Sequence, residues 1–509
     1  MSTTAQARPV PGDLFLPSRP RSVVLWACVA VVVARLSFLT QPLRSDEGGY
    51  LFVARHWRAG GEFLYGDYHV DRPPLLMAIF RIAALSEWDG AIRLLSIPFA
   101  LAAVLAVARA AYVVAGDRAA GWAAVVAAAL LSSPALAADQ ADGELFAAPF
   151  VAGAAALALD SWRRPAGRTR WWLAVGAGVL GGAASLVKQN FLEGLVFVAA
   201  LVVVDGLRSR RVTRRAWALA GGALLGALLP NLATYLWARS AGLGGFDLWT
   251  DLAAFREDAF GVIWAQRTAR PVGRAVALLA LGVLSGLVPL AWTWLRACLA
   301  RRGDVPSVEW ACGVGLVFAT AAIAAGGSYW PHYLIELVPL LALLAGLVAG
   351  RPTQRGRVMQ RWCRVAAVSS AALVLAQAVV YQTIPWLSFQ ERVGEWLAES
   401  SEPGDTALVA YGSPSILEAA DLTTPYPYLW SLPMRTLDPE QRRLRSTLAG
   451  PDAPTWIVEA NGLNSWRIDR SRELRDAVEA RYDKVGVVCG LDVWLRSDLT
   501  RSRAPLPSC

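Results

Sequence analysis

Charged residues are scarce in this sequence. Asp, Glu, Lys and Arg make up 17% of its 509 residues, whereas hydrophobic types make up 55%. Soluble domains carry about a quarter charged residues, so this composition argues against a soluble chain. Several apolar runs reach the length of about 20 residues that a helix needs to cross a bilayer. The sequence therefore predicts an α-helical polytopic membrane protein.

Lysine is almost absent, since Lys188 and Lys484 are its two occurrences in the chain. The formal net charge of +9 therefore comes from arginine. The arginines cluster between apolar runs, as the positive-inside rule requires of cytoplasmic loops. This distribution indicates membrane topology, and no nucleic-acid partner is expected.

The six cysteines form no CxxC pair and no spacing typical of a metal site. Four of them lie in or beside apolar runs, where buried thiols are common. Cys489 and Cys509 fall in the C-terminal region, and they can pair if that region is extracytoplasmic. A Walker phosphate loop is also missing, so the sequence gives no sign of nucleotide binding.

Run length predicts about eleven transmembrane helices. The run 74–88 is too short for another span and carries Arg81, so it is expected to lie in the membrane interface. The expected spans are 22–41, 91–115, 119–137, 144–161, 171–188, 190–207, 216–238, 272–297, 308–326, 331–350 and 363–384.

The arginine-rich loops fix an orientation. With residue 1 in the cytoplasm, every short inside loop carries arginine and the short outside turns carry none. We expect a cytoplasmic tail (1–21), a transmembrane domain (22–385) whose first extracytoplasmic loop is 42–90, and an extracytoplasmic domain (386–509). The heavy Ala, Arg and Gly usage suggests a bacterium, so the expected location is the bacterial cytoplasmic (inner) membrane.

The region 386–509 changes character. Short strand-like runs occur at 407–411, 455–459, 485–488 and 493–495, and they alternate with helical or polar stretches. Pro425 and Pro427 mark a loop between them. We predict a small α/β domain here.

The orientation gathers ionisable residues on the outer face. Asp46 and Glu47 follow the first span, and an acid near hydrocarbon is costly unless water, a cation or a substrate compensates it. The other members of this group are Asp139, Asp142, Glu144, Lys188, His332 and Tyr333. Such a gathering indicates a functional site.

Ordered motifs give these residues a family resemblance. They are Asp46-Glu47-Gly48-Gly49-Tyr50, Asp71-Arg72-Pro73-Pro74, Arg93-Leu94-Leu95-Ser96, Ala141-Asp142-Gly143-Glu144, Gly181 to Lys188, and His332-Tyr333 with the residues to Pro339. Over about residues 20–350 the chain resembles bacterial C-type (GT-C) glycosyltransferases, in the branch of protein O-mannosyltransferases and the lipid A aminoarabinose transferase. One departure is Arg72, where such proteins often have Lys, and this change alters the preferred phosphate geometry.

The resemblance implies a GT-C fold and a reaction. Such enzymes transfer a sugar from a polyprenyl-phosphate donor to a hydroxyl of an envelope acceptor, which is a protein, a glycan or a lipid. The transfer is expected to invert the anomeric centre. No cofactor is required, and a divalent metal is compatible with the site near Asp46 and Glu47, although no ligand spacing demands one.

Asp46 is the expected general base, and Glu47 is an alternative base or an orienting or metal-contacting partner. A local explanation also exists, in which Ser45 caps a helix and both acids sit in its first turn. Tyr50, Asp142 and Glu144 are expected to contact the acceptor or orient the loop.

Five residues are expected to bind the donor phosphate: Arg72, Lys188, Arg93, His332 and Tyr333. Each of the last four has a simpler alternative, because span-end lysines snorkel and arginine and aromatic residues anchor helices at the interface. Asp139 is expected in a solvated turn, and Asp67 and Asp71 in turn hydrogen bonds.

Two rival functions are a transporter or flippase of a lipid-linked sugar and a non-catalytic scaffold. A transporter should show paired discontinuous helices with polar groups at the membrane midplane. The ionisable residues instead lie at one surface, which disfavours transport. A scaffold leaves the acidic pair unexplained.

Overall fold

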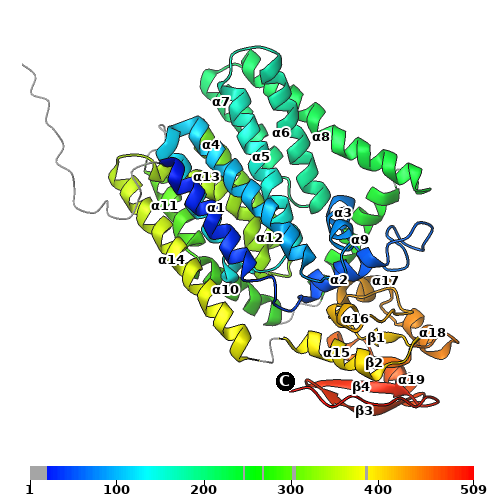
Figure 1. The fold of residues 1–509 in the computed structure, drawn as a ribbon. Coiled ribbons are helices and arrows are strands. Elements are labelled where there is room, and N and C mark those ends of the chain that lie inside the picture. The colour runs from blue at the N-terminus through cyan, green and yellow to red at the C-terminus, as the bar shows by residue number, and fades with distance from the viewer. Residues whose placement is uncertain (1–19, 245–246, 266–268, 301–304, 385–387) are drawn as a thin grey trace, which may run out of the picture.

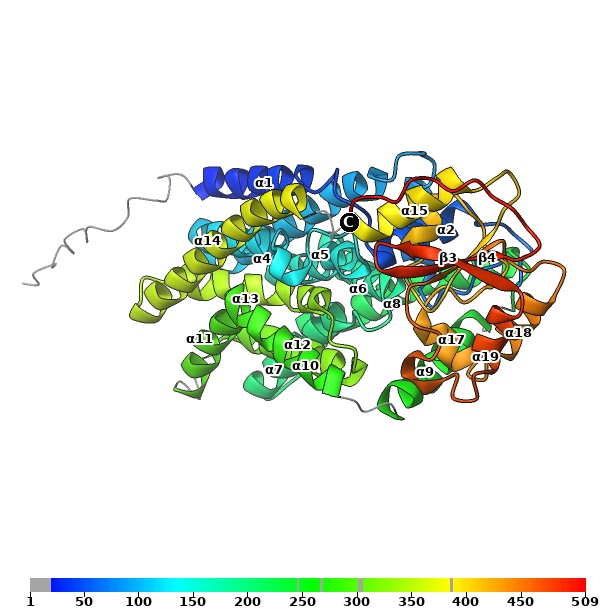
Figure 2. The same ribbon diagram turned by 90° about the horizontal axis from the view of Figure 1, so that it is seen from below.

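A computed structural model describes residues 20–244, 247–265, 269–300, 305–384 and 388–509. Figure 1 shows a body of long helices with a smaller domain of strands and short helices against one end. Figure 2 shows the same two parts from below. The predicted cytoplasmic tail lies outside the described residues, except for its last two positions, which begin the first helix.

The helical body is built from long apolar helices with shorter ones at the end that meets the small domain. The long helices are α1 (Pro20–Leu36), α4 (Ala91–Leu130), α5 (Gly143–Arg163), α6 (Arg168–Val187), α7 (Glu193–Ser209), α8 (Arg214–Ser240), α10 (Ala269–Leu284), α11 (Leu287–Leu299), α12 (Ser307–Gly326), α13 (Val338–Ala349) and α14 (Gln354–Thr383). The helices at the end that meets the small domain are α2 (Ser45–Arg55), α3 (Pro74–Ala83), η1 (Pro134–Leu136), α9 (Asp247–Ala265) and η2 (Pro331–Leu337).

Seven of the described helices are long and apolar enough to cross a membrane, and a bent pair adds an eighth. The prediction of an α-helical polytopic membrane protein is confirmed. The number of eleven spans stays a prediction.

α4 folds back on itself. Non-helical backbone at Gly116 interrupts it. The Arg35 guanidinium donates to the Ser96 hydroxyl near one end of α4 and to the Ala138 carbonyl beyond the other end, so the two ends lie together. The two halves are therefore antiparallel and correspond to two separate predicted spans.

Two helices, rather than one, cover the predicted span 272–297. α10 and α11 meet at an angle of 77°. Gly286, at the bend, has a φ of +82°, which glycine adopts without the penalty of a side chain. Hydropathy does not reveal such a bend, because both arms are apolar. Hydropathy also missed α9, which lies inside the expected loop 239–271.

α3 is too short to cross a membrane by itself. It has ten residues and begins with Pro74 in its first turn. A helix of ten residues is about 15 Å long, half of the hydrocarbon thickness. Its length therefore agrees with the interfacial helix predicted for 74–88.

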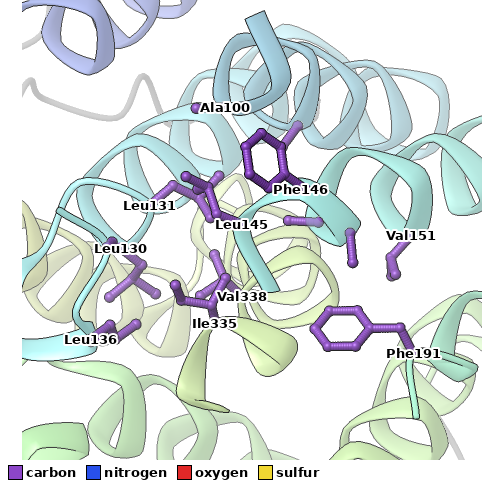
Figure 3. Close-up of a cluster of buried hydrophobic side chains, with 14 of the residues drawn as sticks. Ala100, Leu130, Leu131, Leu136, Leu145, Phe146, Val151, Phe191, Ile335 and Val338 are labelled. Carbon is purple, nitrogen blue, oxygen red and sulfur yellow. The ribbon is translucent and has the colours of Figure 1, made fainter. Parts of the chain in front are cut away.

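The core of the body lies between α4, α5, η2 and α13. Figure 3 shows Leu145 and Phe146 of α5 close to Leu130 and Leu131 of α4, with Ile335 and Val338 beside them. All of these side chains are at most 1% exposed. Close packing of this kind resists displacement, so it fixes the starts of α5 and η2, which carry polar residues of the site.

The small domain confirms the α/β prediction. Its four strands lie in the order β1-β2-β4-β3, with β1 and β2 parallel and the other pairs antiparallel. In the centre of the sheet Leu408 pairs with Ile457, and Ile457 pairs with Trp494. The elements are α15 (Phe389–Ser400), β1 (Ala407–Val409), α16 (Ser415–Ala420), α17 (Ser431–Leu437), α18 (Arg442–Ala449), β2 (Trp456–Glu459), η4 (Ser465–Arg467), α19 (Glu473–Glu479), β3 (Tyr482–Val488) and β4 (Leu491–Arg496).

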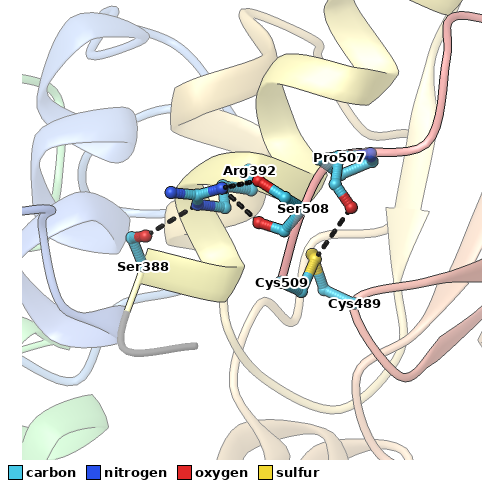
Figure 4. The surroundings of a disulfide bond; sticks show 6 residues. All are labelled: Ser388, Arg392, Cys489, Pro507, Ser508 and Cys509. Carbon is cyan, nitrogen blue, oxygen red and sulfur yellow. Dashed lines mark hydrogen bonds between the residues drawn. A yellow bond between two sulfur atoms is a disulfide. The ribbon is translucent and has the colours of Figure 1, made fainter. Parts of the chain in front are cut away.

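A disulfide joins Cys489 and Cys509, the two cysteines that can pair if their region is extracytoplasmic. Figure 4 shows that the segment ending in Cys509 also lies beside α15, where Arg392 donates to Ser508. The bond therefore holds this segment against the turn between β3 and β4. Disulfides are typical of oxidising compartments.

Candidate active site

α2 begins at the turn that follows α1. Arg44, rather than Ser45, occupies the N-cap position, and its backbone N–H donates to a carboxylate oxygen of Glu47 at 3.0 Å. Asp46 and Glu47 lie in the first turn, where the helix dipole favours negative charge. Their side chains take different directions, because Asp46 lines a cavity and Glu47 is fully buried.

Glu47 is held by four hydrogen bonds. The Arg93 guanidinium donates Nε–H to Oε1 at 2.9 Å and Nη2–H to Oε2 at 2.7 Å. The backbone N–H groups of Ala141 and Arg44 fill the remaining positions at 2.8 and 3.0 Å. Burial raises the pKa of Glu47, but Arg93 and these hydrogen bonds lower it overall below its usual value. A carboxylate accepts about four such bonds, so Glu47 has little capacity left for a proton or a metal.

Arg93 faces away from the cavity. The residue is 1% exposed, and its guanidinium also donates to the carbonyls of Phe38, Gln41 and Pro42. It is therefore neither an interface anchor nor placed to bind a donor phosphate. Instead it ties the turn before α2 to Glu47 and so fixes the position of Asp46.

Asp46 also contacts the small domain. The indole Nε1–H of Trp430, at the start of α17, donates to Asp46 Oδ1 at 2.9 Å. The Trp430 ring packs on Tyr50, with ring centroids 5.3 Å apart. The candidate base is thus oriented by a residue 384 positions later in the chain.

The absence of a side chain at Gly49 permits this contact. A Cβ at Gly49 would lie 2.5 Å from the Trp430 ring and 2.4 Å from Pro414. No real Cβ makes contacts this short, so only glycine lets the small domain approach α2 so closely. An ion pair between Arg55, in the last turn of α2, and Glu418 of α16 adds to the contact.

Arg72 lies across the cavity wall from Asp46. It pairs with Asp71 at 2.6 Å, and Arg256 of α9 contacts the other oxygen of Asp71 at 2.8 Å. The Arg72 guanidinium also lies over the Tyr50 ring, 5.4 Å from its centroid. Burial raises the pKa of Asp71, but Arg256 and then Arg72 lower it to about 2 overall. Two cations share one carboxylate, which leaves a net positive charge for an anionic ligand.

A second polar cluster lies where α5, α6 and η2 meet. The Lys188 ammonium contacts Glu144 and lies 4.5 Å from the centroid of the Tyr333 ring. His332 Nδ1 lies 3.2 Å from Asp142, and its Nε2 lies 3.6 Å from Glu144. Burial, then Asp46 and Glu144, raise the pKa of Asp142. Lys188 is therefore paired within the site, whereas a snorkelling lysine extends toward water.

Most of the predicted residues line one cavity of about 1840 Å³ between the body and the small domain. They are Asp46, Tyr50, Arg72, Lys188, His332 and Tyr333. Four predicted residues lie behind the cavity wall and contact its lining or the loop that carries it: Glu47, Arg93, Asp142 and Glu144.

Sequence reasoning missed several lining residues. Arg44, Arg256 and Arg274 line the cavity from the body. Trp430, Arg435, Arg467 and Arg470 line it from the small domain. None of them belongs to a motif, and nothing local in the sequence distinguishes them from the many other arginines and tryptophans.

Two carboxylates are placed differently from the prediction. Asp139 was expected in a solvated turn but is 4% exposed and accepts a hydrogen bond from Gln377 of α14 at 2.8 Å. Asp71 was expected to make turn hydrogen bonds but holds Arg72 and Arg256. Both expectations assumed exposure to water, which the neighbouring helices prevent.

Among the described residues, no group of three or more His, Cys, Asp or Glu side chains could hold a metal ion. Asp46 accepts a hydrogen bond from the described residues at one oxygen only, whereas both Glu47 oxygens are occupied. Nothing in the site requires a cofactor, and a divalent metal stays compatible with Asp46 alone.

No family model matches the chain, and no curated protein matches it in sequence. Solved structures do. ArnT from Cupriavidus metallidurans bound to undecaprenyl phosphate has a TM-score of 0.64 at 17% identity, covering 93% of this chain and 98% of that one. The apo state of the same protein has a TM-score of 0.61 at 16% identity, covering 93% of this chain and 97% of that one. The Archaeoglobus fulgidus oligosaccharyltransferase tethered with an acceptor peptide has a TM-score of 0.52 at 13% identity, covering 95% of this chain and 74% of that one.

These likenesses define the class of fold. The chain shares the multi-pass helical fold of ArnT and of the archaeal oligosaccharyltransferase, in agreement with the fold that the resemblance of its motifs implies. Within that class the ArnT likeness extends over nearly the whole of both chains, and so includes the small domain.

Proposed function

We propose that this protein is a glycosyltransferase that moves a sugar from a polyprenyl-phosphate donor to a hydroxyl of a cell-envelope acceptor. The observation that carries the proposal is the large cavity that brings a carboxylate, Asp46, together with cations on two sides. The fold supports it, because ArnT binds undecaprenyl phosphate.

Asp46 acts as the general base. The acceptor hydroxyl attacks the anomeric carbon of the donor sugar and gives its proton to Asp46. The bond between the anomeric carbon and the phosphate oxygen breaks, and the bonding electrons leave with polyprenyl phosphate. A single displacement of this kind inverts the anomeric centre.

The departing phosphate gains negative charge, which preorganised cations stabilise. Arg72 and Arg256 supply the net positive charge left after pairing with Asp71. Lys188, His332 and Tyr333 face the same cavity from α6 and η2. Glu47 and Arg93 act behind the wall as positioning residues for the Asp46 turn.

The cavity also suggests the orientation in the membrane. Its residues come from the small domain and from the end of the body that meets it, as Figure 1 shows for α17 and for α2 and α9. We place this end outside the bacterial inner membrane and the N-terminus in the cytoplasm, because the arginine-rich loops lie at the opposite ends of the helices.

A transfer assay tests the proposal. Purified protein in nanodiscs is given radiolabelled polyprenyl-phosphate sugars, with a native membrane extract as the acceptor. The wild-type protein should transfer label from at least one donor, and Asp46→Asn should lose nearly all of that activity, since losing a general base costs about 100- to 10,000-fold.

Asp67→Asn is the matched control. Asp67 lies in the same loop but pairs with Arg58 at the surface and does not line the cavity. Its substitution should leave transfer unchanged. Activity that survives in Asp46→Asn would refute the base assignment. No transfer by folded wild-type protein from any donor would favour a transporter or flippase.

A further inference from the structure

Three arginines of the small domain gather at one side of the cavity. Arg435 lies in α17, and Arg467 and Arg470 lie in and after η4. Asn461 and Ser465 line the cavity beside them. Within the described residues, the small domain contributes no Asp or Glu to this lining.

These three arginines have no carboxylate partner among the described residues. The Arg435 Nε is buried and has no hydrogen-bond partner in that part of the chain. By contrast, seven other arginines of the domain form ion pairs: Arg442, Arg443, Arg445, Arg472, Arg475, Arg496 and Arg501. Arg435 is partly buried, whereas Arg467 and Arg470 are exposed. Partly burying an unpaired cation is unfavourable, so the buried Nε of Arg435 favours an anionic ligand at this side of the cavity.

The backbone that carries this cluster is conformationally strained. Trp466 and Arg467 have φ angles of 58° and 59°, in the left-handed region that non-glycine residues rarely adopt. Two consecutive residues of this kind are costly and persist mainly at functional sites. The Arg435 guanidinium stacks on the Trp466 ring, 5.0 Å from its centroid. Stacking holds the planar guanidinium ready for a bidentate contact with a phosphate or carboxylate.

The cluster is also placed at a useful distance from the candidate base. Trp430, which donates to Asp46, caps α17, and Arg435 lies five residues further along the same helix. Five residues of helix rise about 7.5 Å. An anionic group bound at Arg435 therefore lies within reach of a hydroxyl at Asp46. The Trp466 ring also lines the cavity, and an aromatic ring there suits the apolar side of a sugar ring.

We propose, resting on the transferase function above, that the acceptor is an anionic saccharide. Its phosphate or uronic-acid carboxylate binds Arg435, Arg467 and Arg470, and a neighbouring hydroxyl reaches Asp46. The donor phosphate occupies the other side of the cavity, beside Arg72 and Lys188.

Binding to the full-length protein in nanodiscs, without donor, tests this subsite. The probes are trigalacturonic acid, maltotriose phosphate and neutral maltotriose, measured by thermophoresis. At least one anionic probe should bind about tenfold or more tightly than maltotriose, because charged hydrogen bonds exceed neutral ones in strength. The preferred probe identifies the anion as carboxylate or phosphate.

The variant Arg435→Gln/Arg467→Gln/Arg470→Gln should lose that preference and bind all three probes alike. The control is Arg442→Gln/Arg445→Gln, which removes two arginines of α18 that do not line the cavity. The control should bind as the wild type does, and thermal unfolding checks that both variants fold.

Equal binding of neutral and anionic probes by the wild type, or an unchanged preference in the triple variant, would overturn the subsite. Because this assay needs no transfer, its result is separate from that of the Asp46→Asn experiment. An anion preference without transfer activity would refute the enzyme and keep the subsite.

Discussion

The buried ion pair between Glu47 and Arg93 gives the sharpest prediction about stability. Arg93→Met removes two hydrogen bonds to Glu47 and the donors to three backbone carbonyls. Glu47 then stays fully buried with only backbone N–H partners. Breaking a buried pair from one side costs about 3–5 kcal/mol, because the other charge loses its compensation.

Unfolding of the protein in detergent measures this loss. Arg93→Met should be destabilised by about that amount, and the double variant Glu47→Gln/Arg93→Met should be more stable than Arg93→Met alone, because the uncompensated charge is gone. The control is Arg58→Met, which breaks an exposed pair with Asp67 and should change stability little. If the changes in unfolding free energy caused by the substitutions at Glu47 and Arg93 simply add in the double variant, the pair does not hold the turn before α2.

Two further predictions concern the cavity wall. Trp430→Phe keeps the packing on Tyr50 but removes the N–H that orients Asp46, so kcat for transfer should fall about tenfold with the donor KM unchanged; an unaltered kcat would show that this hydrogen bond is dispensable. Burial raises the pKa of Asp71, but Arg256 and Arg72 lower it to about 2 overall. The ionised Asp71 therefore stabilises the folded protein fully above its ordinary pKa near 4, and this contribution is lost as the pH falls toward 2. Thermal stability should therefore fall between about pH 4 and pH 2, and Asp71→Asn should flatten this decline; equal slopes for both proteins would contradict it.

The sequence revealed the parts of the site that follow from motifs in order along the chain. Asp46, Arg72, Lys188 and His332 were predicted as one group, and the structure brings them to one cavity. Hydropathy and arginine distribution were enough for the polytopic body, because membrane insertion depends on those same properties. The four strands of the small domain followed from short apolar runs between turn signals.

What could not be predicted depends on contacts between distant segments. Nothing near Trp430 in the sequence indicates that its indole reaches Asp46, since the two are 384 residues apart. Arg93 illustrates a different limit, because an arginine at a span end can anchor at the interface, bind phosphate or pair with a buried acid. Only the packing of α4 against the turn before α2 decides among these.

The meeting of Asp46 with Trp430 has a consequence for how the protein matures. α2 is made early in synthesis, whereas α17 is made after all of the long helices of the body. Under the proposed function, a half-made chain already inserted in the membrane holds its carboxylate without the partner that orients it. The protein then becomes active only when the small domain has been exported and folded, so an unfinished chain does not consume the lipid-linked sugar.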